Sequence, residues 1–111
     1  MRFLWVLLLL AGCVATGEVQ YDTQGRLYPE QCRGDLSWVN AKIEHRPLSE
    51  MPEARGYPGE KTTGRVYLNR TPPLIILANE IPADEMDDAI RHERCHIIAG
   101  AWHSYPDASD R

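Results

Sequence analysis

The chain has 111 residues and a formal net charge of −4, enough length for one small domain and a short leader. An acidic surface disfavours nucleic acid and anionic lipid headgroups as electrostatic partners, because both are themselves negatively charged. We therefore expect no nucleic-acid binding, and any membrane association must come from another feature of the chain.

The first segment has the pattern of a secretory leader. Met1-Arg2 is a short positive start, and an unbroken apolar run covers residues 3–10, too short to span a bilayer. Leu10-Ala11-Gly12 and the following Cys13 resemble the bacterial lipoprotein box. This resemblance implies a signal peptide over residues 1–12 and acyl chains on Cys13 that anchor the protein to a membrane. By the same resemblance, Val14 favours the outer membrane over the inner one, with the protein facing the periplasm.

Beyond Cys13 we expect a tether followed by one domain. Residues 13–28 are polar, contain Gly17 and Gly25 and show no clear periodicity, which indicates a lipidated tether. Residues 29–111 then form the single domain. An ordinary signal peptide with an incidental cysteine at position 13 is the alternative.

Three short strands are expected in the domain. Residues 38–45 and 65–69 alternate apolar and polar side chains, as half-buried strands do, and residues 74–78 form a continuous apolar run. The stretch between residues 48 and 64 is rich in Pro, Gly and charge, and we expect a long surface connection of the kind that often borders a functional site. The strand at 74–78 fits either the centre or the edge of a sheet.

One helix follows and carries the main motif of the chain. Pro82 suits its first turn, acidic residues lie near its N-terminal end, and Gly100 suits its C-terminal end. Within it, His92-Glu93-Arg94-Cys95-His96 follows the pattern H-E-x-x-H. On a helix the two histidines stand one turn apart on one face, and Glu93 is close enough to hold a metal-bound water without being a ligand.

This motif resembles the active-site helix of the zincin metallopeptidases. The resemblance implies a small, zincin-like α+β domain in which a short, mostly antiparallel sheet packs on one long active-site helix. It also implies Zn2+ held by His92 and His96, with Glu93 as the general base that activates a zinc-bound water to hydrolyse an amide bond. The substrate would be a peptide, a protein or the peptide of the cell wall.

A catalytic zinc site requires a third protein ligand. No Glu follows Glu93, so the downstream glutamate of the gluzincins is excluded. His103 is the leading candidate, because the string from His92 resembles the metzincin pattern H-E-x-x-H-x-x-G-x-x-H with one extra residue before the glycine. The extra residue turns the helix end by about 100°, and no Met follows the motif, so the metzincin match is incomplete. Asp107 is the second candidate ligand, and His45 is another.

Further assignments concern residues around this motif. Asp88 lies one turn before His92 and can accept its second ring N–H, while Tyr105 is placed to stabilise an oxyanion. Acidic residues early in a helix and packed tyrosines are common without such roles. Cys32 and Cys95 are the remaining thiols, and in an oxidising periplasm we expect them to form a disulfide, with a free buried Cys95 as the alternative.

The sequence as a whole predicts a lipid-anchored, zinc-dependent metallohydrolase of the peptidase class in the bacterial cell envelope. The alternative is a non-catalytic envelope lipoprotein that binds zinc and acts as an interaction module. A metal-free interaction protein is the third hypothesis. Replacement of Glu93 separates the first two, and metal content separates both from the third.

Overall fold

The computed structural model describes residues 20–103. The leader, Cys13, Tyr105 and Asp107 lie outside this range, so the expectations attached to them remain predictions. Within the range, no helix combines the length and the apolar character needed to cross a membrane.

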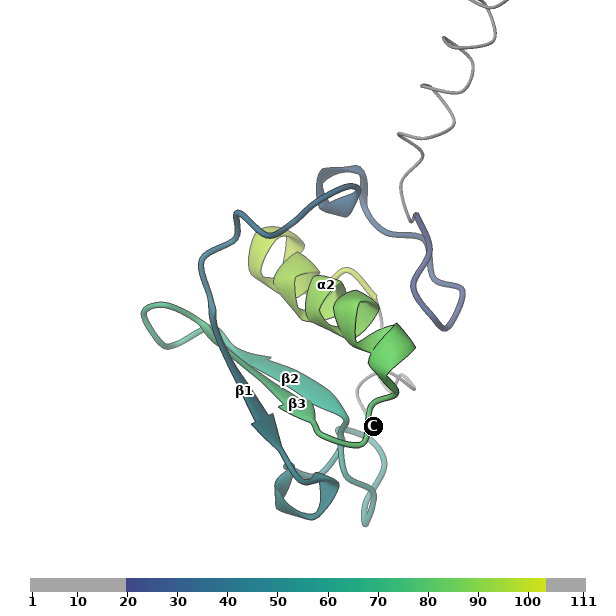
Figure 1. Cartoon of the computed structure of the whole chain (residues 1–111), viewed down its shortest axis with the longest axis vertical. Coiled ribbons are helices and arrows are strands. Elements are labelled where there is room, and N and C mark those ends of the chain that lie inside the picture. The colour runs from purple at the N-terminus through teal and green to yellow at the C-terminus, as the bar shows by residue number, and fades with distance from the viewer. Residues whose placement is uncertain (1–19, 104–111) are drawn as a thin grey trace, which may run out of the picture.

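In the described part of the chain, three strands form one mixed sheet (Figure 1). β1 (Lys42–Arg46) pairs parallel to β3 (Leu74–Ala78), and β2 (Gly64–Tyr67) pairs antiparallel to the other edge of β3. The domain is therefore a small α+β domain. The expectation of a mostly antiparallel sheet is wrong, because β1 reaches β3 through a long crossover that contains β2, and such a crossover permits parallel pairing.

β3 is the central strand, which decides the question that the sequence left open. All its residues are buried, as expected for an apolar run covered on both faces. Alternate side chains face opposite sides of the sheet. Leu77 faces the helix, whereas Ile76 packs in a cluster with Met51 on the other face. The connection between β1 and β2 supplies Met51, so this connection forms part of the core as well as the surface.

The first strand is shorter than the alternation predicts. β1 begins at Lys42, and the residues before it form a turn in which the N–H of Val39 donates to the carbonyl of Leu36 at 3.0 Å. Leu36 and Val39 are buried in a cluster with the N-terminal part of the domain, while Trp38 is 69% exposed. The alternation in residues 38–41 therefore reflects burial in that turn and not strand pairing.

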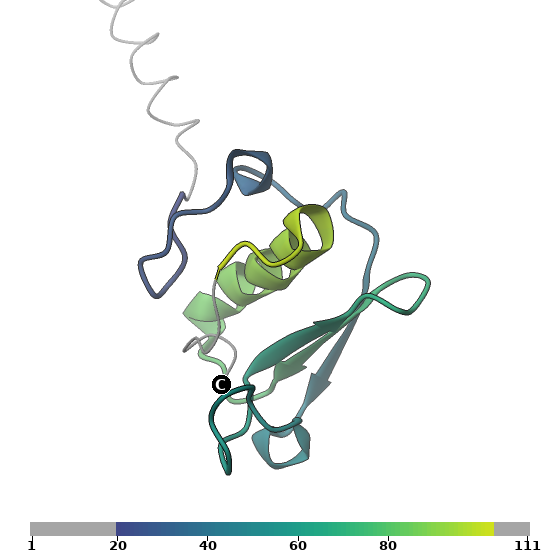
Figure 2. The same cartoon turned by 180° about the vertical axis from the view of Figure 1, so that it is seen from behind.

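The long helix of residues 20–103, α2 (Ala83–Ala99), lies across the sheet (Figures 1 and 2). It follows Pro82 and ends at Gly100, as the sequence predicts. Gly100 has a φ of 68°, a conformation that favours glycine, and the chain turns back along the helix from this point.

The segment formed by residues 20–36, called the N-terminal segment below, covers the side of α2 that faces away from the sheet (Figure 2). It contains a β-bridge between Tyr21 and Leu27 and the short helix η1 (Glu30–Cys32). Asp22 and Tyr28 are buried in it. The assignment of residues 20–28 to a tether is therefore wrong: they pack on α2 and belong to the domain.

Candidate metal centre

Three histidine rings meet at the C-terminal half of α2. His92 and His96 lie on one face of the helix, and both are buried. After Gly100 the chain reverses, and His103 returns to the same face. The Nε2 atoms lie 3.3 Å apart for His92 and His96, 3.0 Å for His96 and His103, and 3.1 Å for His92 and His103. The three residues are close enough together to bind one metal ion.

These distances fit a shared ion. Imidazole nitrogens bound to zinc at about 2.0–2.1 Å in tetrahedral geometry lie about 3.3 Å from one another. Burial, with repulsion from His92 and His103, lowers the pKa of His96 to about 4. A low pKa keeps the ring neutral near neutral pH, and the neutral ring is the form that binds a metal.

Two of the rings are oriented through their other nitrogen. Nδ1 of His96 donates to the carbonyl of Gly100 at 2.8 Å, which leaves Nε2 available as a ligand atom. Nδ1 of His92 lies 3.6 Å from Oδ2 of Asp22 in the N-terminal segment. A carboxylate or carbonyl at this position selects the tautomer and increases the basicity of a metal-binding histidine.

Asp22 is itself held by a tight turn. Its Oδ1 accepts the backbone N–H groups of Gln24 and Arg26 at 2.9 and 2.8 Å, and its Oδ2 lies 2.6 Å from Nε of Arg26. Burial raises the pKa of Asp22, but the hydrogen bonds with His92 and Arg26 outweigh this effect and hold the pKa well below its usual range. Sequence reasoning missed Asp22, because the turn composition around Gly25 predicts an Asx turn but not its proximity to the helix.

The structure does not support the role expected for Asp88. Its Oδ1 accepts the hydroxyl of Tyr28 at 2.8 Å, and its Oδ2 accepts the backbone N–H of Thr23 at 3.0 Å. The N-terminal segment covers this face of α2 and supplies both donors, so Asp88 joins α2 to the segment and does not orient His92. Burial and the bond to Asp88 raise the pKa of Tyr28 above its usual value.

Glu93 lies between the histidines and the sheet. It is 3% exposed, and its Oε2 lies 3.8 Å from Nε2 of His92. β2 passes directly in front of it: a Cβ atom at Gly64 would lie 3.4 Å from Oε2 of Glu93 and 3.2 Å from a methyl of Leu77. Glycine at the start of β2 therefore lets the strand approach the carboxylate closely.

Trp102 and a disulfide surround the cluster on its other side. The Trp102 ring lies 5.1 Å from that of His92 and 5.8 Å from that of His96, measured between centroids. Cys32 and Cys95 form the expected disulfide, which attaches the N-terminal segment to α2 at the residue before His96. Sequence reasoning missed Trp102, since a single aromatic residue beyond the end of a helix has no distinguishing pattern.

The remaining candidates stand apart from the cluster. His45 is exposed on β1 and does not belong to the group of histidines that can share an ion in the described chain. Tyr105 and Asp107 lie beyond the described residues.

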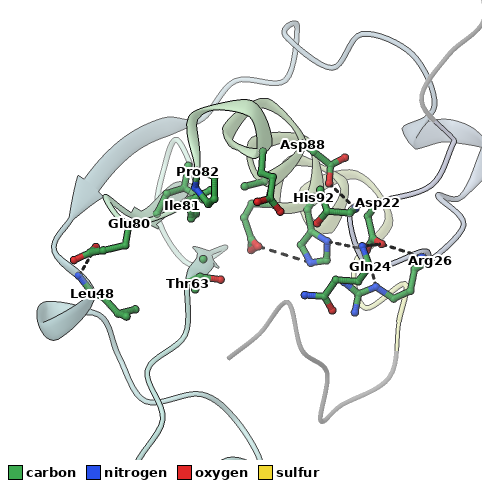
Figure 3. Close-up of a pocket in the computed structure, with 16 residues that line it drawn as sticks. Asp22, Gln24, Arg26, Leu48, Thr63, Glu80, Ile81, Pro82, Asp88 and His92 are labelled. Atoms are coloured by element: carbon green, nitrogen blue, oxygen red, sulfur yellow. Dashed lines mark hydrogen bonds and ion pairs between the residues drawn. The ribbon is translucent and has the colours of Figure 1, made fainter.

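Glu93 lines two pockets. The larger, of about 420 Å³, also contains His92 and the beginning of β2, and Figure 3 shows it with Glu80 and Leu48 at the end opposite His92 and Asp22. The smaller, of about 220 Å³, contains His96 and later residues of β2. Glu93 thus lines both pockets, while His92 borders the larger one and His96 the smaller one.

We found no match to this chain among protein-family models, curated proteins or solved structures, so the geometry of the histidines, Glu93 and the two pockets is the basis on which its function is inferred.

Proposed function

We propose that the protein is a zinc-dependent metallohydrolase that cleaves peptide bonds. The observation that carries this proposal is the juxtaposition of three imidazoles, whose Nε2 atoms lie 3.0 to 3.3 Å apart, with one buried carboxylate that is not part of the triad. Three protein ligands leave a coordination position for water and substrate, which a structural four-ligand site does not.

The donor set favours a transition metal, and zinc is the one we propose. Three imidazoles suit zinc, copper, nickel and iron better than magnesium or calcium, which prefer oxygen ligands, and availability generally decides among the former. When bound, zinc would polarise a carbonyl and lower the pKa of its water to about 7.

Glu93 is the proposed general base. Its position beside the triad lets it take a proton from the attacking water and return it to the leaving amine, the two transfers that amide hydrolysis requires. Its burial beside His92 restricts the carboxylate to this location. His92, with Asp22 behind it, and His96, with the carbonyl of Gly100 behind it, hold their ligand nitrogens toward the same point.

A peptide substrate is favoured by β2. Within the described residues, β2 pairs only with β3, so its other edge is open for the backbone of an extended peptide. Because Ala78 donates to the carbonyl of Thr63 at 2.8 Å, strand alternation directs the backbone groups of Gly64 and Val66 toward this other edge. The carbonyl of Gly64 accepts the hydroxyl of Thr62 at 2.8 Å, so the N–H of Gly64 and the backbone groups of Val66 are the ones offered to a peptide. The same edge runs past Glu93.

The proposed location follows from the leader alone. Lipidation at Cys13 would hold the domain at a bacterial membrane. The outer membrane is favoured over the inner one, with the domain on the periplasmic side. The substrate would then be an envelope protein, a peptide or the peptide of the cell wall.

The test combines metal analysis with one substitution. The purified full chain, in detergent, is expected to contain about one zinc per molecule. The X-ray absorption spectrum of this zinc should show three nitrogen ligands from the protein. Glu93→Gln should retain zinc, but its rate of peptide hydrolysis should be lower by about a hundredfold or more, since general-base catalysis contributes at least that factor. Glu50→Gln, an exposed residue of η2 (Leu48–Glu50), is the matched control and should change neither quantity.

Three results would contradict the proposal. Zinc well below one per chain favours a metal-free interaction protein. A fourth protein ligand on the zinc favours the non-catalytic binding module. Unchanged hydrolysis in Glu93→Gln removes Glu93 from the reaction.

A further inference from the structure

The N-terminal segment begins with a small hairpin, formed by residues 20–28. Tyr21 and Leu27 form its β-bridge, and backbone hydrogen bonds of 2.7 and 2.9 Å flank this pair on both sides. The two residues are therefore a non-hydrogen-bonded antiparallel pair, the kind of pair in which the strands approach most closely. Side chains of such a pair lie next to each other on the same face of the hairpin.

The inner face of the hairpin is packed on α2. Asp22 and Tyr28, the residues that follow the bridged pair, are only 7% and 0% exposed. The hydroxyl of Tyr28 donates to Asp88 at 2.8 Å, and the disulfide between Cys32 and Cys95 ties the chain to the helix a few residues later. The hairpin is thus fixed against α2, so its other face has a defined direction.

The outer face of the hairpin is apolar and exposed. Tyr21 is 57% exposed and Leu27 is 49% exposed, and they are two of the four large apolar side chains that residues 20–103 leave exposed. Single exposed apolar residues are ordinary on a protein surface. Two that are held side by side form a small apolar patch, which indicates a contact surface.

The hairpin also carries little charge of its own. The whole chain has 16 acidic and 12 basic side chains, so its surface is acidic overall. Residues 20–28 contain one carboxylate, that of Asp22, and it is buried and paired with Arg26 at 2.6 Å. An anionic membrane therefore repels the hairpin less than it repels an acidic surface.

Along the chain, the hairpin is the first described element after the proposed lipid anchor. Tyr21 lies eight residues beyond Cys13, and eight residues span at most about 29 Å. A short tether raises the effective concentration of its target to the order of millimolar, so a patch of two side chains suffices for contact. Tyrosine suits a bilayer surface, because its ring enters the apolar boundary while its hydroxyl stays hydrated.

We propose that the outer face of the hairpin, formed by Tyr21 and Leu27, contacts the surface of the membrane to which Cys13 is anchored. The contact gives the domain one orientation. The N-terminal segment lies toward the membrane and the sheet lies away from it, because the two cover opposite sides of α2 (Figure 2). The inference rests on the proposed lipid anchor and not on the hydrolase chemistry.

The experiment measures the quenching of tryptophan fluorescence by brominated lipids, which quench only on contact. The full chain, acylated at Cys13, is placed in vesicles of phosphatidylethanolamine and phosphatidylglycerol. Tyr21→Trp is compared with Leu68→Trp, each combined with Trp38→Phe, and Trp102 gives both chains the same background.

Leu68 is the matched control because its exposure, 55%, is close to that of Tyr21. It begins the loop between β2 and β3, which lies on the far side of the molecule from the hairpin in both views (Figures 1 and 2). Brominated lipids should lower the emission of the Tyr21→Trp chain by about a third or more, since an interfacial side chain reaches the acyl boundary. The emission of the Leu68→Trp chain should not change.

A second variant tests the partner in the bridge. Leu27→Ser, added to the Tyr21→Trp chain, should reduce the quenching by about twofold, because it removes apolar area from the patch. Leu68→Ser in the same chain is the control and should leave the quenching unchanged. Circular dichroism checks that both variants are folded.

The outcomes decide the proposal. Equal emission of the Tyr21→Trp chain in brominated and ordinary vesicles overturns the membrane contact and leaves a protein partner for the patch. Equal quenching of Tyr21→Trp and Leu68→Trp overturns the single orientation. Mass spectrometry that finds no acyl chain on Cys13 removes the anchor and overturns the proposal as well. None of these results bears on the hydrolase, which Glu93→Gln tests separately.

Discussion

The two layers that cover α2 are built in different ways. On one side, the sheet holds its strands through backbone ladders, and β3 is buried throughout. On the other side, the N-terminal segment makes no ladder with the helix. It is attached through the disulfide at Cys95, the bonds to Asp88 and the approach of Asp22 to His92. The sheet lines the two pockets beside Glu93, while the segment orients the metal ligands.

This difference implies that stability and metal affinity can be separated by substitution. Changes within the sheet should lower the free energy of unfolding without altering the geometry of the imidazoles. Changes within the N-terminal segment should alter the metal site directly, because its contacts with α2 surround the histidines.

The largest expected effect comes from the disulfide. Replacing both cysteines (Cys32→Ser with Cys95→Ser) should lower the free energy of unfolding by about 4 kcal/mol, because a long loop is released in the unfolded chain. Zinc affinity should fall as well, since the segment carrying Asp22 is then less firmly held. Thermal denaturation and competition with a chromophoric chelator measure the two effects.

Ile76→Ala in β3 is the matched substitution on the sheet side, because Ile76 is buried with Met51 on the face of the sheet that points away from α2. It should cost about 2–5 kcal/mol of stability, a similar loss, with unchanged zinc affinity in the folded protein. If both variants lose zinc affinity equally, general destabilisation explains the loss and the division between the layers is wrong.

A smaller effect is expected from Asp22. Asp22→Asn should weaken zinc binding by about 10- to 100-fold, the usual effect of removing the partner of a metal-binding histidine. Asp88→Asn is the control, because Asp88 contacts Tyr28 and Thr23 and not a ligand. It should lower the melting temperature and leave zinc affinity near that of the unchanged chain. The reverse pattern would restore Asp88 as the orienting residue.

The last expected effect is a pH dependence of the metal-free protein, which is small just below neutral pH and grows as the solution is acidified. The pKa of His96 is about 4 in the folded chain, below its ordinary value of 6.5. Between these pH values the unfolded chain binds the proton more readily than the folded chain does. The free energy of unfolding therefore falls as the pH drops from about 6.5 toward 4, and the contribution of the neutral His96 is fully present above pH 6.5. Denaturant unfolding at several pH values measures the slope, and His96→Asn should reduce it. An unchanged slope in the variant would assign the pH dependence to other groups.

The sequence by itself determined the elements whose patterns are local. The apolar run at residues 74–78 is a strand, and the helix lies between Pro82 and Gly100, because burial periodicity and chain-end preferences act over a few residues. The same local geometry placed His92 and His96 on one face, and Gly100 before His103 indicated the return of the chain. The spacing of these residues contained most of the candidate metal centre.

Tertiary structure alone decided which distant segments of the chain meet in the sheet and around the candidate metal centre. Contacts between residues far apart in the chain determine three features: the parallel pairing of β1, the central position of β3, and the burial of Asp22 beside His92. Asp88 was a reasonable local choice, but Tyr28 and Thr23 occupy its carboxylate from across the fold. Periodicity describes which face of an element is buried, and it contains no information about which other segment covers that face.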